Sequence, residues 1–222
     1  MQKKYAKIAH TSPDKIQIYC IDHSAEFLPM FSSKLSNYGR KFIDEWNIHL
    51  FLQCSINEVL PNEVRYVDND GNEKSLVANT IIWTTGVSGS DVIKNSGYPE
   101  KRGRVHVNDD LTAPNDPTVY IIGDVAAYFP DNEKRPCPTT AQLAIAMGEC
   151  AAKNLIKELK DQPTQKFVYD SLGTIASLGK SVAFGKVFGL SLEGKLGVLA
   201  KKATFVKATY ETGGLKAIFH VS

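Results

Sequence analysis

The sequence predicts an α/β fold built on a parallel sheet, with an antiparallel β-meander inserted into it. Short apolar runs alternate with helical segments in the N-terminal half, which is typical of strand–helix–strand units. A second group of short alternating runs is separated by turn signals such as Asp70-Gly71, which favours hairpins. Residues 161–222 are rich in glycine and in Phe, Val and Leu, and we expect a C-terminal α+β segment there.

Residues 2–10 are typical of the last turns of a helix, and residues 15–22 of a strand that ends on Asp22. Apolar residues at 3/4 spacing predict a helix over 32–48, capped by Ser32 or Ser33. An extended run follows, and then a series of strands separated by tight turns: 63–67, 73–77 and 80–86.

After loops and short strands, residues 119–122 predict a buried strand that runs into Gly123-Asp124. Residues 139–160 predict a helix capped by Thr139 or Thr140. The remaining residues mix strands with one amphipathic helix. We expect three divisions of the chain, at residues 1–96, 97–160 and 161–222.

The net charge and the spacing of the cysteines restrict which partners and sites the sequence predicts. The net charge of the 222 residues is only +2, which shows no nucleic-acid footprint. Residues 185–222 hold six lysines against two glutamates, and this basic tail indicates an anionic partner, of which a membrane surface is one candidate. The cysteines lack CxxC or metal-ligand spacing, so we expect reduced packing residues and no metal site. No apolar run reaches the ~18–20 residues that span a bilayer.

Ligands of parallel sheets bind at the carboxyl ends of the strands, and three predicted strand ends carry suggestive residues. Asp22 can accept hydrogen bonds from a ribose 2′-OH, which would favour NADH because a 2′-phosphate would be repelled. Thr85-Gly86 would let a cofactor approach the backbone closely. Each has a plain structural alternative: Asp22 as a turn cap, and Thr85-Gly86 as a tight turn. No GxGxxG occurs in the chain, and since the sequence opens in mid-helix we expect that loop to precede Met1.

Asp124 can bind a sugar or ribityl hydroxyl, or it can cap the next turn. Pro-Cys-Pro-Thr-Thr-Ala-Gln then leads directly into a helix (136–142). A helix N-terminus presents free N–H groups to an anionic or electron-rich ligand. The combination of strand-end carboxylate and following helix predicts a cofactor site.

A series of motifs resembles type II NADH dehydrogenases, the single-subunit, non-proton-pumping NADH:quinone oxidoreductases. The motifs occur in the family's order and cover essentially the whole chain: LPMF (28–31), IIWTTGV (81–87), KRGRVHVNDDL (101–111), YIIGDVAAYFP (120–130), RPCPTTAQLA (135–144) and GTIASLG (173–179). The resemblance implies part of a two-Rossmann flavoprotein fold that binds FAD and NADH. Residues 1–96 would be the remainder of the NADH domain, 97–160 the C-terminal part of the FAD domain, and 161–222 a membrane-facing or dimer-facing segment.

The resemblance also implies roles for particular residues. Asp22 would hold the NADH ribose, while Thr85 and Gly86 would line the nicotinamide channel. Gly123 and Asp124 would bind the ribityl–phosphate region of FAD. The backbone of Ala141 and Gln142 would meet the isoalloxazine ring, with Gln142 also facing the quinone pocket as the catalytic contact.

Two departures from the family pattern lie on the expected quinone side. The family usually reads AQxxxQ, but Ala146 stands at the second glutamine position. Thr204, near Lys201, replaces an aliphatic residue. Use of a non-quinone acceptor therefore stays open. Because the glycine loops for both cofactors are missing, we expect the isolated chain to be inactive, and a role as a binding or dimerisation module also stays open.

Apolar residues at 3/4 spacing, bracketed by lysines, predict an amphipathic helix near the C-terminus. Its apolar positions are Leu196, Leu199, Ala203, Val206 and Tyr210. Such a helix can lie on a membrane, or it can be an ordinary core helix. Taken with the resemblance, it implies a homodimer that is cytoplasmic and peripheral on the inner face of the cell membrane.

Overall fold

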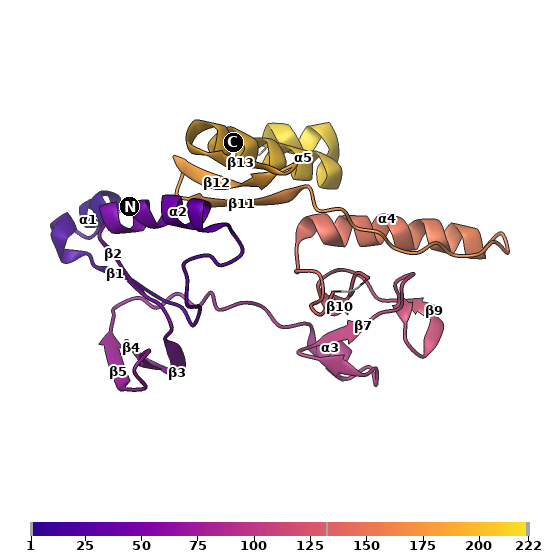
Figure 1. The fold of residues 1–222 in the computed structure, drawn as a ribbon, viewed down its shortest axis with the longest axis horizontal. Helices are drawn as coiled ribbons and strands as arrows, with labels where there is room; N and C mark the ends of the chain where they lie inside the picture. Colours follow the sequence, from indigo (N-terminus) through magenta and orange to yellow (C-terminus); the bar gives the residue numbers. More distant parts are fainter. Residues whose placement is uncertain (1, 132, 221–222) are drawn as a thin grey trace. The chain divides into compact units, whose positions relative to one another are not determined.

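The computed structural model describes residues 2–131 and 133–220, which divide into two compact units (Figure 1). Unit 1 comprises Met1–Thr85 and Leu172–Lys207. Unit 2 comprises Gly86–Ser171 and Ala208–Ser222. Helices and strands are mixed in both units, which confirms the predicted α/β class.

Unit 1 contains the predicted strand–helix–strand motif. Strands β1 (Ile18–Ile21) and β2 (Ile48–Phe51) pair in parallel, with α2 (Ser33–Glu45) between them in sequence. Helix α1 (Gln2–Ile8) and a 3₁₀ turn, η1 (Pro13–Lys15), precede β1. Ser32 occupies the N-cap of α2, as predicted, although its side chain makes no capping hydrogen bond.

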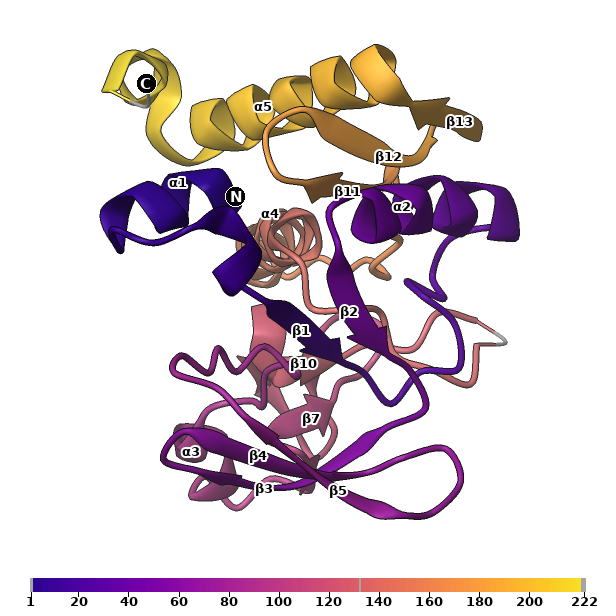
Figure 2. The ribbon, with the colours of Figure 1, turned by 90° about the vertical axis from the view of Figure 1, so that its left-hand side faces the viewer.

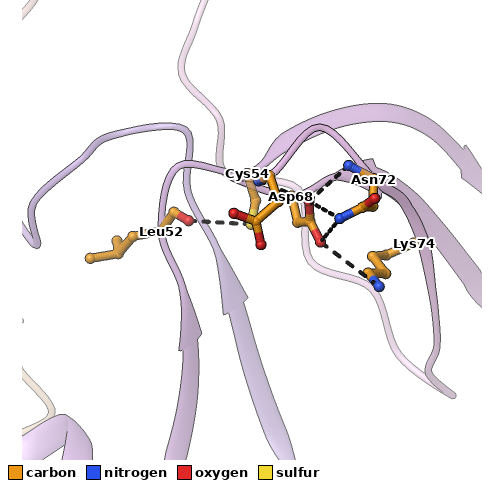
Figure 3. Close-up of polar contacts among 6 residues, drawn as sticks. Leu52, Cys54, Asp68, Asn72 and Lys74 are labelled. Atoms are coloured by element: carbon orange, nitrogen blue, oxygen red, sulfur yellow. Dashed lines mark hydrogen bonds and ion pairs between the residues drawn. The ribbon is translucent and has the colours of Figure 1, made fainter.

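The predicted meander is an antiparallel sheet of β3 (Ser55–Leu60), β4 (Glu63–Val67) and β5 (Glu73–Val77). Asp68 closes the turn before Gly71: its Oδ1 accepts from the backbone N of Asn72 at 2.8 Å (Figure 3). The same oxygen accepts from the backbone N of Asp70 at 3.0 Å. Lys74 Nζ lies 3.8 Å from Asp68 Oδ2. The backbone hydrogen bond from Asn72 is the largest factor that lowers the pKa of Asp68. The Asp70-Gly71 hairpin prediction is confirmed.

A second antiparallel sheet lies between two helices of unit 1 (Figure 2). It contains β11 (Gly173–Leu178), β12 (Val182–Val187) and β13 (Leu190–Glu193). Phe184 is fully buried against α2, where a Cβ added to Gly39 would lie 2.3 Å from its ring. The other face meets the start of α5 (Gly194–His220), because a Cβ on Gly197 would lie 2.1 Å from the carbonyl oxygen of Ala183. Glycine at both positions therefore permits close packing.

Unit 2 consists of short strands packed on one long helix, α4 (Ala141–Glu158). The shorter elements are α3 (Asp91–Lys94), β6 (Glu100–Lys101), β7 (Arg104–His106), β8 (Thr112–Ala113), β9 (Asp116–Tyr120), η2 (Gly123–Val125) and β10 (Ala126–Ala127). Strands β7 and β10 pair in parallel, whereas β8 and β9 are antiparallel. Leu143 and Met147 of α4 lie in the core, together with Val105, Leu111 and Ile121.

One predicted strand is absent, and another has different bounds from those predicted. Residues 80–86 form no strand: no described strand pairs with them, and Ile82 and Trp83 are 79% and 59% exposed. An apolar run becomes a strand only where a neighbour completes the hydrogen-bond ladder. The strand predicted at 119–122 is instead β9, Asp116–Tyr120. Ile121 N still bonds to Leu111 O, and the chain turns at Gly123, which adopts φ +72°.

Candidate functional site

Asp22 lies at the carboxyl end of β1, as predicted. Its backbone N donates to Phe51 O at 2.8 Å, which fixes it beside the end of β2. Its Oδ1 accepts from Ser24 N at 2.8 Å, so the carboxylate does cap the following turn. About half of the side chain is still exposed (48%). The same carboxylate can therefore hold the turn and present oxygen to a ligand.

Asp22 is ionised at neutral pH. Partial burial works to raise the pKa of this carboxyl, but the hydrogen bonds from Ser24 and the nearby imidazole of His23 outweigh it, and the net pKa lies below the usual range. His23 Nδ1 is 3.5 Å from Asp22 Oδ1. A negative charge at this strand end accepts hydroxyl donors and repels a phosphate.

Gly123 and Asp124 belong to η2, which packs against the first two turns of α4. Gly123 N donates to Met147 Sδ at 3.3 Å, and a Cβ on Gly123 would meet the Cβ of Ala144 at 3.8 Å. Gly123 has φ +72°, a conformation that glycine adopts without strain. The next side chain, Asp124, is exposed. The tight turn thus holds a solvent-facing carboxylate against the start of a helix.

The N-terminus of α4 is open to a ligand. Thr140 caps it, with its side chain accepting from Leu143 N at 3.3 Å, which confirms the predicted cap. The first N–H groups of an α-helix have no partner within the helix. Ala141 is exposed and Gln142 half-buried, and each contributes such a group. These amides add positive potential to the site.

Arg104 positions the segment that leads into α4. Its guanidinium donates to Ala126 O at 2.8 and 3.2 Å and to Cys137 O at 3.1 Å. Cys137 N in turn donates to Tyr128 O at 2.8 Å. The start of α4 is therefore tied to the strand that follows Asp124.

The predicted site residues divide between the two units. Gly123, Asp124, Ala141, Gln142 and Ala146 share unit 2, and Gln142 and Ala146 are one helical turn apart on α4. Five of the predicted positions are thus grouped in one unit, around one helix.

The other predicted positions lie outside that grouping. Asp22 and Thr85 belong to unit 1, whereas Gly86 opens unit 2 with φ +110°. Lys201 and Thr204 are on the unit 1 part of α5, where Lys201 Nζ donates to Ile175 O at 3.4 Å and Thr204 Oγ1 to Lys201 O at 2.8 Å.

Comparison with known proteins identifies the family. A family model described as pyridine nucleotide-disulphide oxidoreductase matches residues 4–148. The chain belongs to the pyridine nucleotide-disulphide oxidoreductase family. Two curated relatives, both called type II NADH:quinone oxidoreductase, carry the comparison further.

The Staphylococcus saprophyticus relative is 36% identical over 206 residues, 92% of this chain and 51% of that protein. The Staphylococcus aureus relative is 35% identical over 207 residues, 93% of this chain and 51% of that protein. The resemblance drawn from the motifs is confirmed, and the chain spans about half the length of these relatives.

Solved structures confirm the fold of this family member. NDH2 from Plasmodium falciparum in complex with NADH superposes with a TM-score of 0.81 at 15% identity, covering 98% of this chain and 60% of that one. The sulfide:quinone oxidoreductase of Aquifex aeolicus gives 0.69 at 18% identity, covering 95% and 54%. The partial two-Rossmann flavoprotein fold expected from the motifs is thereby confirmed.

The described cysteines of this family member are free, and the pKa of three of them is raised. Burial is the largest factor that raises the pKa of Cys20, Cys54 and Cys137. A raised pKa reduces the thiolate, which is the reactive form. Over residues 2–131 and 133–220 there is also no group of three metal-ligating side chains, and no helix there is long and apolar enough to cross a membrane.

Sequence reasoning missed the residue that anchors the far end of α4. Asn154 is fully buried, and its Nδ2 donates to Asp110 O at 3.3 Å and to Gln165 O at 3.0 Å. Its Oδ1 accepts from Gln165 N at 2.9 Å. The sequence could have pointed to Asn154, because its amide side chain falls at helical spacing from the apolar residues of α4. Arg104 gave no such signal, because its acceptors are distant backbone carbonyls.

Proposed function

We propose that the chain is the NADH- and flavin-binding portion of an enzyme that oxidises NADH and reduces a quinone. The observation that carries this proposal is the solvent-facing Asp124 held by Gly123 and Met147 against the open N-terminus of α4. The relatives called type II NADH:quinone oxidoreductase support the choice of reaction. We assign NADH binding to residues 1–96, flavin binding to 97–160 and membrane or dimer contact to 161–222.

Asp22 supports NADH as the electron donor. Its ionised, half-exposed carboxylate at the end of β1 can accept both hydroxyl hydrogens of an adenosine ribose. The same charge disfavours a ribose 2′-phosphate, and therefore NADPH. Thr85 and Gly86 are exposed and carry little or no side-chain bulk, so we assign them to the path of the nicotinamide.

The residues around α4 fit a flavin. Asp124 can accept from a ribityl hydroxyl, and the free N–H groups of Ala141 and Gln142 can donate to the pyrimidine edge of the ring. A bound FAD would supply two-electron uptake from NADH and delivery to the acceptor. The chain contributes position and electrostatics: the α4 N-terminus stabilises negative charge at that edge. No side chain is required to move a proton in the oxidation of NADH.

We assign the acceptor side to Gln142, Ala146, Lys201 and Thr204. Gln142 is the polar contact, and Ala146 one turn later contributes no hydrogen bond. The methyl side chain of Ala146 favours an acceptor that is less polar where it meets this residue. A non-quinone acceptor is the second candidate, because a single amide constrains the acceptor less than two would.

We further propose that the enzyme is a homodimer on the inner face of the cell membrane. Leu196, Leu199 and Val206 of α5 are 64%, 64% and 47% exposed. Lys195 and Lys202, also exposed, lie beside these apolar positions. Lysines in such positions reach anionic headgroups while the apolar side chains enter the interface.

Flavin occupancy tests the proposal. The half of the S. saprophyticus relative outside the match, joined to this chain, should yield a protein with flavin absorbance. Asp124→Ala should lose that flavin, whereas Asp170→Ala, a matched removal of an exposed carboxylate, should retain it. Equal flavin occupancy in the two variants would contradict the assignment.

A further inference from the structure

His23 follows directly after Asp22, the carboxylate proposed to hold the ribose of NADH. The hydrogen bond from Asp22 N to Phe51 O fixes this point of the chain beside the end of β2. The imidazole of His23 is 86% exposed, and its Nδ1 lies 3.5 Å from Asp22 Oδ1, within the range of an ion pair. The ribose site therefore contains a carboxylate and, beside it, a side chain whose charge depends on pH.

Imidazole is the side chain whose charge normally changes between pH 5 and 8. Asp22 stays ionised over this range, because its pKa lies below the usual aspartate value. Protonation of His23 therefore changes the net charge of the pair from −1 to zero. The pair acts on a neighbouring anion with a different sign at each end of this range.

The charged groups packed around the pair do not duplicate this change. The other titratable side chains of β1, β2 and the segments that follow them are Tyr19, Cys20, Glu26, His49 and Cys54. Burial is the largest factor that raises the pKa of both thiols, so they stay neutral. His49 stacks on Tyr19, with ring centroids 4.9 Å apart. On α2, which packs against β2, Arg40 and Lys41 are paired with carboxylates of the same helix.

We infer that His23 is a specificity-determining residue: its protonated imidazole admits an adenosine ribose with a 2′-phosphate, and its neutral imidazole excludes it. The inference rests on the proposed binding of NADH at Asp22 and deepens it. With a neutral imidazole, the charge of Asp22 repels the phosphate. The imidazolium offsets that charge, and its Nε2–H can donate to a phosphate oxygen. The preference for NADH over NADPH is then strongest above neutral pH and weakens in acid.

The size of the effect is limited by the exposure of the imidazole. A charge pair open to solvent changes an affinity by roughly twofold to fivefold, and salt screens it further. A phosphate monoester carries close to two negative charges at neutral pH, which places the expected change at the upper end of that range. We therefore expect the preference to change by about fivefold at low salt.

Nucleotide binding tests the inference without any transfer of electrons. The protein is the joined form described above, and the probes are adenosine 5′-monophosphate and adenosine 2′,5′-bisphosphate, which differ only in the 2′-phosphate. Calorimetry at about pH 5.5 and about pH 8 gives the ratio of their Kd values. From the higher to the lower pH, the ratio in favour of the monophosphate should fall about fivefold more in the parent than in His23→Asn. His23→Arg, positively charged throughout, should discriminate weakly at both pH values.

The comparison with His23→Asn removes the contribution of the 2′-phosphate and of Glu26, since both proteins share them. His10→Asn is the matched control, because it replaces another exposed imidazole of unit 1, before β1 rather than after it, and it should keep the parental pH dependence. An equal pH dependence in the parent and in His23→Asn would overturn the inference and leave NADH binding at Asp22 intact. Binding of neither nucleotide would overturn both the inference and the proposed function.

Discussion

Replacing Met147 with alanine should destabilise unit 2 and loosen the turn that holds Asp124. Met147 is fully buried in the core, and its sulfur accepts the backbone N–H of Gly123. Truncating a buried methionine to alanine costs about 2–5 kcal/mol, from lost apolar burial and the cavity left behind. Because the side chain has no exposed surface and belongs to the same core as Leu143 and Ile121, we expect about 3 kcal/mol.

The assay is urea unfolding followed by far-UV circular dichroism, with hydrogen exchange of the α4 amides to localise the effect. Tryptophan fluorescence would report on the other unit, since Trp46 and Trp83 both lie in unit 1. With a urea dependence of about 2 kcal/mol per molar, the midpoint should fall by about 1.5 M. Met147→Leu keeps the volume and should cost less than about 1.5 kcal/mol. A shift below about 0.5 M for Met147→Ala would refute the packing argument.

Four other sites give further predictions. Asn154→Ala should cost about 2–4 kcal/mol, because it empties a fully buried position and removes the partners of one part-buried N–H and two carbonyls; a loss below about 1 kcal/mol in urea unfolding would contradict this. Gly197→Ala should destabilise by about 1–3 kcal/mol through its clash with the β12 backbone. Gly148→Ala, with open space around it, should instead stabilise the free chain by about 0.5–1 kcal/mol in the same assay. Finally, burial opposes ionisation of Asp110, but the hydrogen bonds from its neighbours Thr112 and Thr164 outweigh it, so its folded pKa is lowered. The contribution of Asp110 to the free energy of unfolding should therefore be fully present above about pH 4, the usual aspartate pKa. It should be lost as the pH falls through the lowered pKa of Asp110 in the folded protein. Asp110→Asn should flatten that part of a stability–pH profile, and an unchanged acid slope would contradict the assignment.

Local patterns predicted the elements whose partners lie within this chain. The strand before Asp22, the Asp70-Gly71 hairpin and the Thr140-capped helix each depend on contacts within a few residues or with the next element. Residues 80–86 show where such patterns fail. Their apolar sequence is that of a buried strand, but a strand also needs a neighbour to bond to, and none of the described strands pairs with them.

The sequence indicated which residues would make up the candidate site, but not which residues hold them in place. A carboxylate after an apolar run, followed by a helix start, pointed to Asp124 and Ala141. Two side chains hold this arrangement in place, Arg104 as a donor and Met147 as an acceptor, and both act over more than 20 residues of sequence. Such contacts leave no periodic trace, because they depend on how the elements pack.

The most direct test of the proposed function is the nucleotide-dependent reduction of a quinone. The protein is the joined form described above, loaded with flavin and supplied with a short-chain soluble quinone. We predict that it oxidises NADH continuously only when quinone is present, and NADPH far more slowly. Asp22→Ala should narrow the difference between the two nucleotides. A flavin-loaded protein that consumes no NADH with quinone, or an Asp22→Ala variant with unchanged nucleotide preference, would contradict the account.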